Sequence, residues 1–459
     1  MITGVRFKAY PTVEQKITLS QWMGCARFIW NAKCDEHKYL YQFAKKYLPT
    51  GTYAPIDQSF AQYKSKELSP WLYHCPSQIL RNSASNWYKT CKNFMKGACG
   101  KPKRKKRDET GSVHLTREIF HLEQESPGKW KLFIGQKNNN IGYLRFNAHR
   151  SFTEPNSIYI RKDHGKYFVS FCYENDQIIE NQATLRDHFD YLQTCSKEHL
   201  EEICIGIDRG VKRPLQVGNV TYDFTSIAKA KKASKDSYIK RMQKKLSKQK
   251  KGSNRRNKTK RKIRKAHRKI ADIRNDFCHK ASRSIVSDET KKVFILENLQ
   301  TASMTKASLP KQENGKYVKN GKKAKSGLNK SILDTSWNRI ETYISYKATW
   351  AGKAVFKISP YQTSQECADC GHTHPENRKK QDLFLCVHCG LTENADVNAA
   401  HVIKKRAINC FLNSGTELSS KGVLLDIGRG AKGKTPVAKA TDARGQEASK
   451  KRDQAAVAG

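Results

Sequence analysis

Two short apolar runs, each ending in a carboxylate, constrain the fold of this chain more than any other feature. The run ICIGID ends at Asp208, and the run VFILE ends at Glu297. Strands that are apolar on both faces are typical of the buried interior of a sheet. A carboxylate at the end of such a strand is costly to desolvate unless a cation compensates its charge. The two runs therefore predict a buried sheet that holds metal at one edge.

A third carboxylate follows near the end of the chain. Asp396 begins DVNAAHVIKKRA, a predicted helix whose Ala399, Ala400 and Ile403 are spaced to pack close to that sheet. Three carboxylates from separate elements suit a pair of Mg²⁺ ions, one activating water and the other stabilising the leaving oxygen of a phosphodiester. This combination of strand, strand and helix is what a nuclease of the RNase H type needs.

Each carboxylate also has a simpler interpretation when it is taken alone. Asp208, followed by Arg-Gly, fits a turn residue. Glu297 fits an ion-paired strand end, and Asp396 fits a helix cap. The strand order and the basic charge of the chain favour the joint interpretation as a catalytic metal site.

Four of the 14 cysteines have the spacing C-x2-C-x15-C-x2-C. This spacing is typical of a structural zinc ribbon, in which four thiolates close a tetrahedron and leave no position for a substrate water. Coincidence and an iron–sulfur cluster are the alternatives. His372, His374 and His388 lie nearby but are expected to be surface residues, because four thiolates suffice. The predicted ligands are Cys367, Cys370, Cys386 and Cys389.

The charge balance indicates a polyanionic partner. The chain has 87 Lys and Arg against 42 Asp and Glu, a formal charge of +45. Such a chain repels itself when compact unless an anion neutralises it, and nucleic acid is the expected anion. A membrane surface fits less well, because no apolar window is long enough to span a bilayer and the start lacks a signal peptide. We therefore expect a cytoplasmic or nucleoid-associated protein.

The positive charge is densest between residues 229 and 269, where 21 Lys or Arg accompany a single acid, Asp236. Sparse apolar residues at helical spacing predict a long helical hairpin that contacts a phosphate backbone. The alternative is a solvated basic face. A second basic run, KPKRKK at 101–106, is interpreted as a linker or a phosphate-contacting loop. The predicted nucleic-acid contacts are Lys240, Arg241, Lys244, Lys245, Arg255, Arg256, Arg261, Arg264, Lys103 and Arg104.

The remaining segments give a coarse order of elements. The strand GVRFKAY precedes a helix that Thr12 and Gln15 are spaced to cap. Short β-rich runs from about 112 predict a small antiparallel barrel or sandwich, with a hairpin turn at Gly165. We expect a polar connector at 176–200, a mobile loop at 301–330 that is a candidate lid, and a helix over DTSWNRIETYISYKATWAG. The last ~45 residues are expected to be disordered.

These motifs together resemble TnpB, the RNA-guided nuclease of IS200/IS605-type transposons and a relative of compact type V CRISPR effectors. The matching stretches are GIDRG, FILENL, DTSWNRI, SPYQTSQECADCG, CVHCG and ADVNAA. The opening RFKAYPTVEQ, with Gly24, Arg27 and Asn31, is also similar. The match is ordered over about 203–410 and looser over the first 175 residues, and it fails in the connector and in the basic tail.

The resemblance implies a multidomain α+β fold with a split RuvC-like nuclease domain, which has the RNase H fold. It implies a guide RNA that pairs with double- or single-stranded target DNA beside a short adjacent motif, two Mg²⁺ ions, one structural Zn²⁺, and a monomer on one RNA. The expected domains are 1–11 and 112–200, a β-barrel wedge domain and connector; 12–111, a helical recognition domain; 201–360, the nuclease domain with the basic hairpin 229–287; 361–391, the zinc ribbon; 392–412, the last nuclease helix; and 413–459, a disordered tail.

The sequence leaves three other functions open. The first is a nuclease-inactive, RNA-guided DNA-binding regulator, against which the presence of all three carboxylates argues. The second is a type V CRISPR effector with the same chemistry and a guide from a repeat array. The third is a zinc-ribbon DNA-binding accessory protein, which leaves the two buried strand-end carboxylates unexplained.

Overall fold

The computed structural model describes residues 2–49, 56–107, 110–136, 139–174 and 183–426. The chain divides into two compact units: Met1–Gln182 with Ile227–Asp272, and Ala183–Ser226 with Ile273–Gly459. Among the described residues, no helix has both the length and the apolar character that a membrane crossing requires. The disorder predicted for 427–459 concerns residues outside the described part of the chain.

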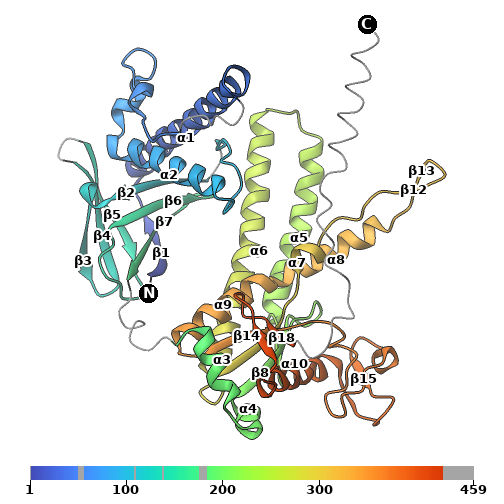
Figure 1. Cartoon of the computed structure of the whole chain (residues 1–459). Coiled ribbons are helices and arrows are strands. Elements are labelled where there is room, and N and C mark those ends of the chain that lie inside the picture. Colours follow the sequence, from blue (N-terminus) through green and yellow to red (C-terminus); the bar gives the residue numbers. More distant parts are fainter. Residues whose placement is uncertain (1, 50–55, 108–109, 137–138, 175–182, 427–459) are drawn as a thin grey trace. The chain divides into compact units, whose positions relative to one another are not determined.

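The first unit is built on one antiparallel sheet of seven strands in the order β2-β6-β7-β1-β5-β4-β3 (Figure 1). Its strands are β1 (Ile2–Tyr10), β2 (Thr110–Thr116), β3 (Phe120–Ser126), β4 (Lys129–Gln136), β5 (Asn139–Asn147), β6 (Ser157–Asp163) and β7 (Lys166–Glu174). The predicted hairpin turn at Gly165 is confirmed. His164 and Gly165 both have positive φ, 50° and 88°, as a two-residue turn between twisted strands requires.

Helices α1 (Val13–Tyr47) and α2 (Ser77–Met95) pack against this sheet. The predicted cap of α1 is confirmed, because the Thr12 hydroxyl accepts from the Gln15 backbone N–H and the Gln15 side chain accepts from the Thr12 N–H. Short 3-10 helices lie at Ala61–Tyr63, Pro70–His74 and Arg117–Ile119. Helices and sheet share one core around Phe7, Trp22 and Phe146.

The basic segment forms two helices, α5 (Ser226–Ser247) and α6 (Asn254–Ser287), joined by a short turn (Figure 1). A narrow apolar seam holds them together, with Ile239 of α5 against Ile263 and Ile270 of α6. The other positions carry mostly exposed Lys and Arg. Beyond Asp272, α6 continues into the second unit.

The second unit is built on a five-stranded sheet in the order β10-β9-β8-β11-β14. Its strands are β8 (Cys204–Asp208), β9 (Leu215–Val217), β10 (Val220–Tyr222), β11 (Val293–Glu297) and β14 (Ala354–Ile358). Strands β8, β11 and β14 run parallel, while β9 and β10 are antiparallel. All five residues of β11 are buried, as its apolar run predicts.

Helices cover both faces of this sheet. On one face, Val293 and Ile295 pack in a core with residues of α3 (Leu185–Gln193), α4 (Lys197–Ile203) and α10 (Ala395–Leu412). On the other, Phe294 and Leu296 pack with the end of α6 and with α9 (Trp337–Trp350). The predicted polar connector therefore contributes two helices to the core.

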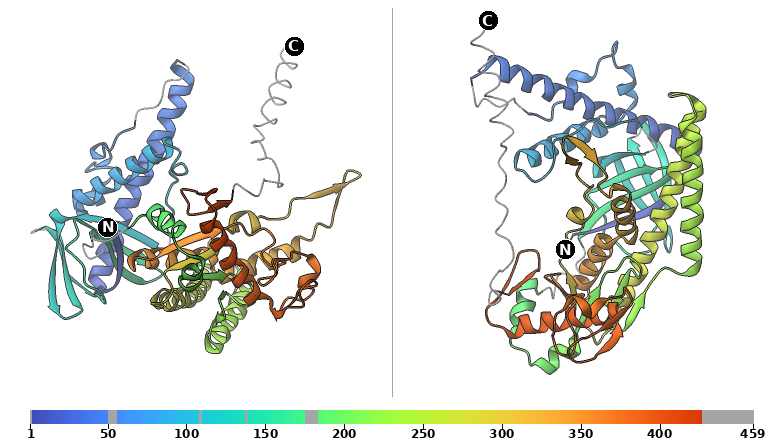
Figure 2. Two further views of the ribbon diagram at one scale, coloured as in Figure 1. Left: turned by 60° about the horizontal axis from the view of Figure 1, so that its bottom comes forward. Right: turned by 90° about the vertical axis from the view of Figure 1, so that its right-hand side faces the viewer.

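Two sequence expectations are wrong. Residues 301–330 are not an unstructured loop but contain α7 (Thr301–Met304), β12 (Lys311–Glu313), β13 (Lys316–Val318) and the start of α8 (Lys322–Thr335). The β12–β13 hairpin projects from the helices that flank it (Figure 1 and Figure 2). Residues 413–426 are not disordered either, because β17 (Thr416–Leu418) and β18 (Leu424–Asp426) pair with each other, and Val423 bridges to Lys357 of β14.

Packing of the last helix should dominate the stability of the second unit. Phe411 is 1% exposed, with its ring 5.2 Å from that of Phe356 and 6.1 Å from that of Phe189. We predict that Phe411→Ala lowers the free energy of unfolding by about 3–5 kcal/mol. The neighbouring Leu412 is 45% exposed, so Leu412→Ala serves as the control. Equal shifts of the two variants in thermal unfolding would contradict this packing.

Candidate functional site

The sheet brings two of the predicted carboxylates together. In the parallel pair of β8 and β11, Ile207 lies opposite Leu296, so Asp208 and Glu297 follow at the same carboxyl-terminal edge. Glu297 is only 7% exposed, and Asp208 is half-buried. The two acids, 89 positions apart in sequence, therefore stand on adjacent strands in a largely dry environment.

Helix α10 brings the third carboxylate to the same edge because its backbone lies directly on β8. A Cβ atom added at Gly206 would stand 2.0 Å from the Ala400 carbonyl oxygen, so only glycine allows this approach. Ala399, Ala400 and Ile403 are buried, as the sequence predicts. Asp396 lies one turn before Ala400, which places it near the end of β8.

Asp396 does not cap its helix. The N-cap residue is Asn394, whose side-chain oxygen accepts a hydrogen bond from the Asp396 backbone N–H at 3.1 Å. The Asp396 carboxylate instead faces Arg378, with 3.5 Å between Nη2 and Oδ1. Its side chain is 14% exposed. The interpretation of Asp396 as a simple cap is therefore wrong, and its carboxylate is free for another role.

The electrostatics of the three acids are mutually unfavourable without a cation. Burial, together with the charges of Glu297 and Asp396, raises the pKa of Asp208 to about 7. Burial also raises the pKa of Glu297, against a lowering hydrogen bond from Thr363. A buried carboxylate whose pKa is raised both by burial and by neighbouring carboxylates is a candidate functional group, and a bound cation would relieve this repulsion.

Several residues that sequence reasoning missed hold this edge in place. The Thr363 hydroxyl donates to Glu297 Oε1 at 2.5 Å. Arg209 is 3% exposed; it donates to the backbone oxygen of Glu297 and pairs with Glu341 at 2.6 Å. Lys357 of β14 pairs with the other oxygen of Glu341. The only sequence signal for Arg209 was its place directly after Asp208.

The site opens into a small pocket of about 230 Å³ that Asp208 and Asp396 both line. Among the described residues, only the four cysteines form a group whose ligand atoms all lie within 4.8 Å of one another. The three carboxylates do not form such a group among the described residues. Their oxygen donors, burial and shared charge fit hard divalent cations such as Mg²⁺.

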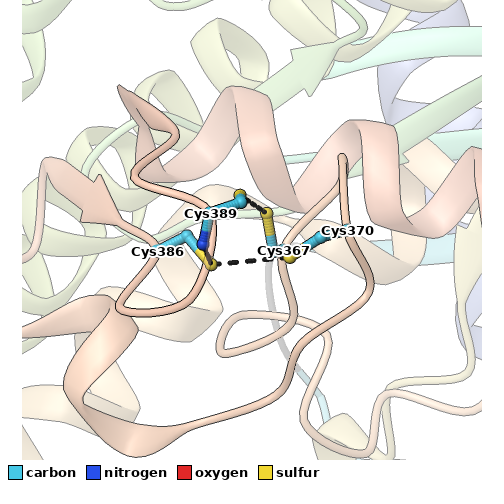
Figure 3. A group of neighbouring side chains, drawn as sticks. All are labelled: Cys367, Cys370, Cys386 and Cys389. Carbon is cyan, nitrogen blue, oxygen red and sulfur yellow. Dashed lines mark hydrogen bonds between the residues drawn. The ribbon is translucent and has the colours of Figure 1, made fainter.

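The four predicted cysteines form a closed cluster (Figure 3). The Sγ atoms of Cys367 and Cys389, and those of Cys370 and Cys386, are 3.6 Å apart. Four thiolates about 2.3 Å from a central zinc ion lie about 3.8 Å from one another, so the spacing fits the metal. Gly371 and Gly390, which follow the two knuckles, adopt positive φ of 75° and 77°.

Two buried asparagines join the cysteine segment to its surroundings. Asn377 donates to the His372 carbonyl and accepts from the Val387 N–H, which links the two knuckles. Asn398 of α10 accepts from the Ala368 N–H at 2.9 Å and thereby attaches the first knuckle to the helix that carries Asp396. Strands β15 (Leu383–Leu385) and β16 (Thr392–Asn394) complete the segment, with a 3-10 helix at Pro375–Arg378.

Seven of the eight cations predicted on the basic hairpin are exposed on α5 or α6. Arg256 is the exception. It is half-buried and donates to the Gln249 and Leu246 carbonyls, so it closes the turn between the helices. The guanidinium of Arg256 is thus engaged within the turn, and its contact with nucleic acid stays a prediction.

The second basic run is not a loose linker. Trp30 donates to the Lys103 carbonyl, and Asn31 exchanges two hydrogen bonds with the backbone of Lys105, so the run is fixed along α1. Arg104 pairs with Asp35 at 2.5 Å. Lys103 is exposed and suited to bind phosphate, whereas Arg104 is engaged within the protein.

Three protein-family descriptions match this chain. Residues 170–308 match a family of IS605 OrfB proteins described as "Probable transposase". Residues 1–46 match an OrfB family described as a helix-turn-helix domain, although here they contain one strand and the single long helix α1. Residues 337–403, which include the cysteine cluster, match a "Cas12f1-like, TNB domain".

Named relatives cover most of the chain. A protein of Escherichia coli (strain K12) named "Putative RNA-guided DNA endonuclease InsQ" is 29% identical over 402 residues, 87% of this chain and 90% of the relative. A "Putative RNA-guided DNA endonuclease" of Streptomyces pristinaespiralis is 24% identical, covering 87% of each chain. "CRISPR-associated endodeoxyribonuclease Cas12f1" of Sulfoacidibacillus thermotolerans is 33% identical over 135 residues, 29% of this chain and 28% of the relative.

A solved structure shares the fold. The protein chain in "Cryo-EM structure of the Cas12f1-sgRNA-target DNA complex" superimposes with a TM-score of 0.53 and 13% identity, covering 88% of this chain and 98% of that one. At this identity the likeness concerns the fold alone.

The acid cluster predicts an unusual dependence of stability on pH in metal-free protein. The pKa of Asp208 is about 7 in the folded state, while an unfolded aspartate has a pKa of about 3.9. Folding therefore takes up a proton between these values, and stability falls, by at most about 4 kcal/mol, as the pH rises from about 4 through about 7.

We predict that Asp208→Asn removes this loss, so that in EDTA above about pH 7 the variant melts at a higher temperature than the wild type. Added Mg²⁺ should raise the melting temperature of the wild type much more than that of the variant. Asp276→Asn, which changes an exposed carboxylate, is the control. A wild-type protein that gains stability across this range would contradict the arrangement.

Proposed function

This chain belongs to the TnpB family, which is related to compact type V CRISPR effectors, and on that premise we propose that it is an RNA-guided DNA endonuclease. The observation that carries the proposal is the meeting of Asp208, Glu297 and Asp396, from β8, β11 and α10, at the carboxyl-terminal edge of two parallel strands. We infer that these are the catalytic residues and that they hold two Mg²⁺ ions.

Mg²⁺ bound by these carboxylates would lower the pKa of an attacking water and stabilise the charge on the leaving oxygen of the phosphodiester. Other side chains of the protein hold these carboxylates in position. Thr363 orients the Glu297 carboxylate, and Arg209 fixes the end of β11 through its backbone oxygen. Arg378 pairs with Asp396 and offsets part of the negative charge of the site.

We propose that the nuclease part has the RuvC arrangement of the RNase H fold. The order of its elements supports this, since parallel β8, β11 and β14 are followed by the cysteine segment and then by α10. In this scheme 1–11 and 112–200 form a wedge domain, 12–111 a recognition domain and 201–360 the nuclease domain. Segment 361–391 is the zinc ribbon, and 392–412 returns to the nuclease sheet.

We also propose that the four cysteines bind one structural zinc ion. The closed geometry of four sulfurs supports a structural rather than a catalytic role, because no ligand position is left for water. The link from Asn398 to the first knuckle gives the metal an indirect effect on the site, since Asn398 and Asp396 share the start of α10.

The partners of the proposed enzyme are a guide RNA and target DNA. The exposed cations of α5 and α6 suit backbone contacts, and base pairing with the guide would then read the sequence. A protein acting on chromosomal DNA in this way would work in the prokaryotic cytoplasm, at the nucleoid. A nuclease-inactive regulator is disfavoured because all three acids are present and converge.

The central test is cleavage by variants of the carboxylates. Asp208→Ala and Glu297→Ala should each lower the rate of guided DNA cleavage in Mg²⁺ by at least about 10³-fold, because the metal ligands are lost. Guide-dependent DNA binding should persist, as measured by gel shift. Asp276→Ala, which removes an exposed carboxylate paired with Lys280, should cut normally.

Full cutting by the Asp208→Ala, Glu297→Ala double variant would refute the active-site assignment. Sequencing of RNA that copurifies with the protein tests the guide itself. A defined RNA with a variable 3′ segment is expected, and its absence would favour an accessory DNA-binding protein.

The zinc proposal is tested by metal content. Cys386→Ser should release the zinc measured by elemental analysis and lower the temperature of thermal unfolding, because the segment is too small to form a core without metal. Cys172→Ser, which changes an exposed cysteine outside the cluster, should keep the metal. Unchanged zinc in the Cys386 variant would rule out the ribbon.

A further inference from the structure

An exposed ion pair lies at the rim of the carboxylate pocket. Lys212, in the loop after β8, and Asp382, just before β15, both line the pocket, with 2.5 Å between Nζ and Oδ2. Their side chains are 57% and 50% exposed. Ion pairs between such exposed groups contribute little to stability, so the contact is easily exchanged for another.

The other cations of this pocket already have fixed partners. Arg209 is buried against Glu341, and Arg378 faces Asp396. Arg213 donates to the Asn394 side chain at 3.1 Å and so supports the cap of α10. Lys212 is thus the one cation lining the pocket in the described structure whose partner is an exposed carboxylate with no role in holding the acids.

The backbone of Asp382 is fixed independently of its side chain. Its carbonyl accepts from the Ala395 N–H at 3.2 Å and from the Asn394 amide at 3.1 Å. Release of Lys212 would therefore leave Asp382 in place. For the same reason Asp382→Asn, which keeps the shape of the side chain, should preserve these two bonds.

A DNA strand that enters this pocket brings backbone phosphates beyond the one that the proposed Mg²⁺ ions would hold, and these phosphates need cations of the protein. A lysine at the rim suits the task because its ammonium binds phosphate as a mobile point charge. We propose that Lys212 binds a backbone phosphate of the DNA strand entering the pocket, and that the Asp382 carboxylate competes with this phosphate for Lys212. This proposal rests on the proposed nuclease function and adds a substrate contact to it.

The proposal predicts effects of opposite sign for the two partners of one ion pair. Lys212→Ala removes the phosphate contact and should raise KM several-fold for a single-stranded substrate, with kcat nearly unchanged. Asp382→Asn frees the lysine and should lower KM. In the double variant, Asp382→Asn should cause no further change in KM, because the lysine that it would release is absent. A purely structural ion pair would instead give changes of the same sign.

The experiment uses the RNA-loaded protein in Mg²⁺ and, as the substrate, a short fluorescent single-stranded DNA that carries the sequence matched by the guide. KM and kcat are measured at several salt concentrations, and Lys212→Ala should lower the slope of log KM against log salt by about one. Anisotropy of the same probe in Ca²⁺ measures its binding without cleavage. Lys212→Arg should keep the wild-type KM.

The ribbon offers a matched control pair. Glu376 and Lys379 are 2.9 Å apart with side chains 54% and 69% exposed, and neither lines the pocket. Glu376→Gln and Lys379→Ala change the net charge as the test variants do, so they report any general effect of charge on DNA affinity. Both should leave KM within the error of the wild type.

KM and probe affinity that shift in opposite directions for Asp382→Asn and Lys212→Ala, beyond the control pair, would support the proposal. Equal shifts in test and control variants, or the same direction for both partners, would overturn it. A wild-type complex that binds the probe but cuts no DNA refutes the proposed function, while the binding measurement still decides the role of Lys212. Zinc content and thermal unfolding, measured for each variant, identify misfolded protein.

Discussion

The close approach of α10 to β8 at Gly206 is the contact on which the rest of the site depends. Without a side chain at this position, the helix backbone comes near enough for Ala399 and Ala400 to fill the space above the sheet. One turn earlier, the same helix presents Asp396 to the strand ends, and Asn398 to the cysteine segment. The proposed catalytic carboxylate and the attachment of the proposed zinc segment therefore lie on the same short stretch of α10.

Much of this arrangement could be predicted because its signals are local. Apolar runs such as VFILE identify a strand buried on both faces, and the carboxylate that ends each run is visible in the sequence. The capping residues Thr12 and Gln15 lie three positions apart and make the hydrogen bonds that their types predict. The spacing of the four cysteines likewise predicts that their sulfurs cluster, since four thiolates at this separation can close around one metal ion with few other contacts to hold them.

The rest depends on partners far apart in the chain. Arg209 and Glu341 are 132 positions apart, so no local pattern links them. Asn394 rather than Asp396 caps α10. The capping residue is set by where the helix begins, and the local sequence does not show that position. The segment 301–330 was misjudged for its polarity, although Asn314-Gly315, with φ of 49° and 75°, is a strong hairpin signal. The hairpin near 416–426 folds because Leu424 enters a core built by distant residues.

The position of α10 after the two carboxylate strands also sets the order in which the proposed site is completed during synthesis. Synthesis proceeds from the N-terminus, so the basic helices and both carboxylate strands leave the ribosome before the cysteine segment and before Asp396. A nascent or prematurely ended chain can hold nucleic acid, but it lacks the third acid and the helix that covers one face of its sheet. On the proposed assignment, chain order therefore leaves the site of the three acids incomplete until α10 has been synthesised.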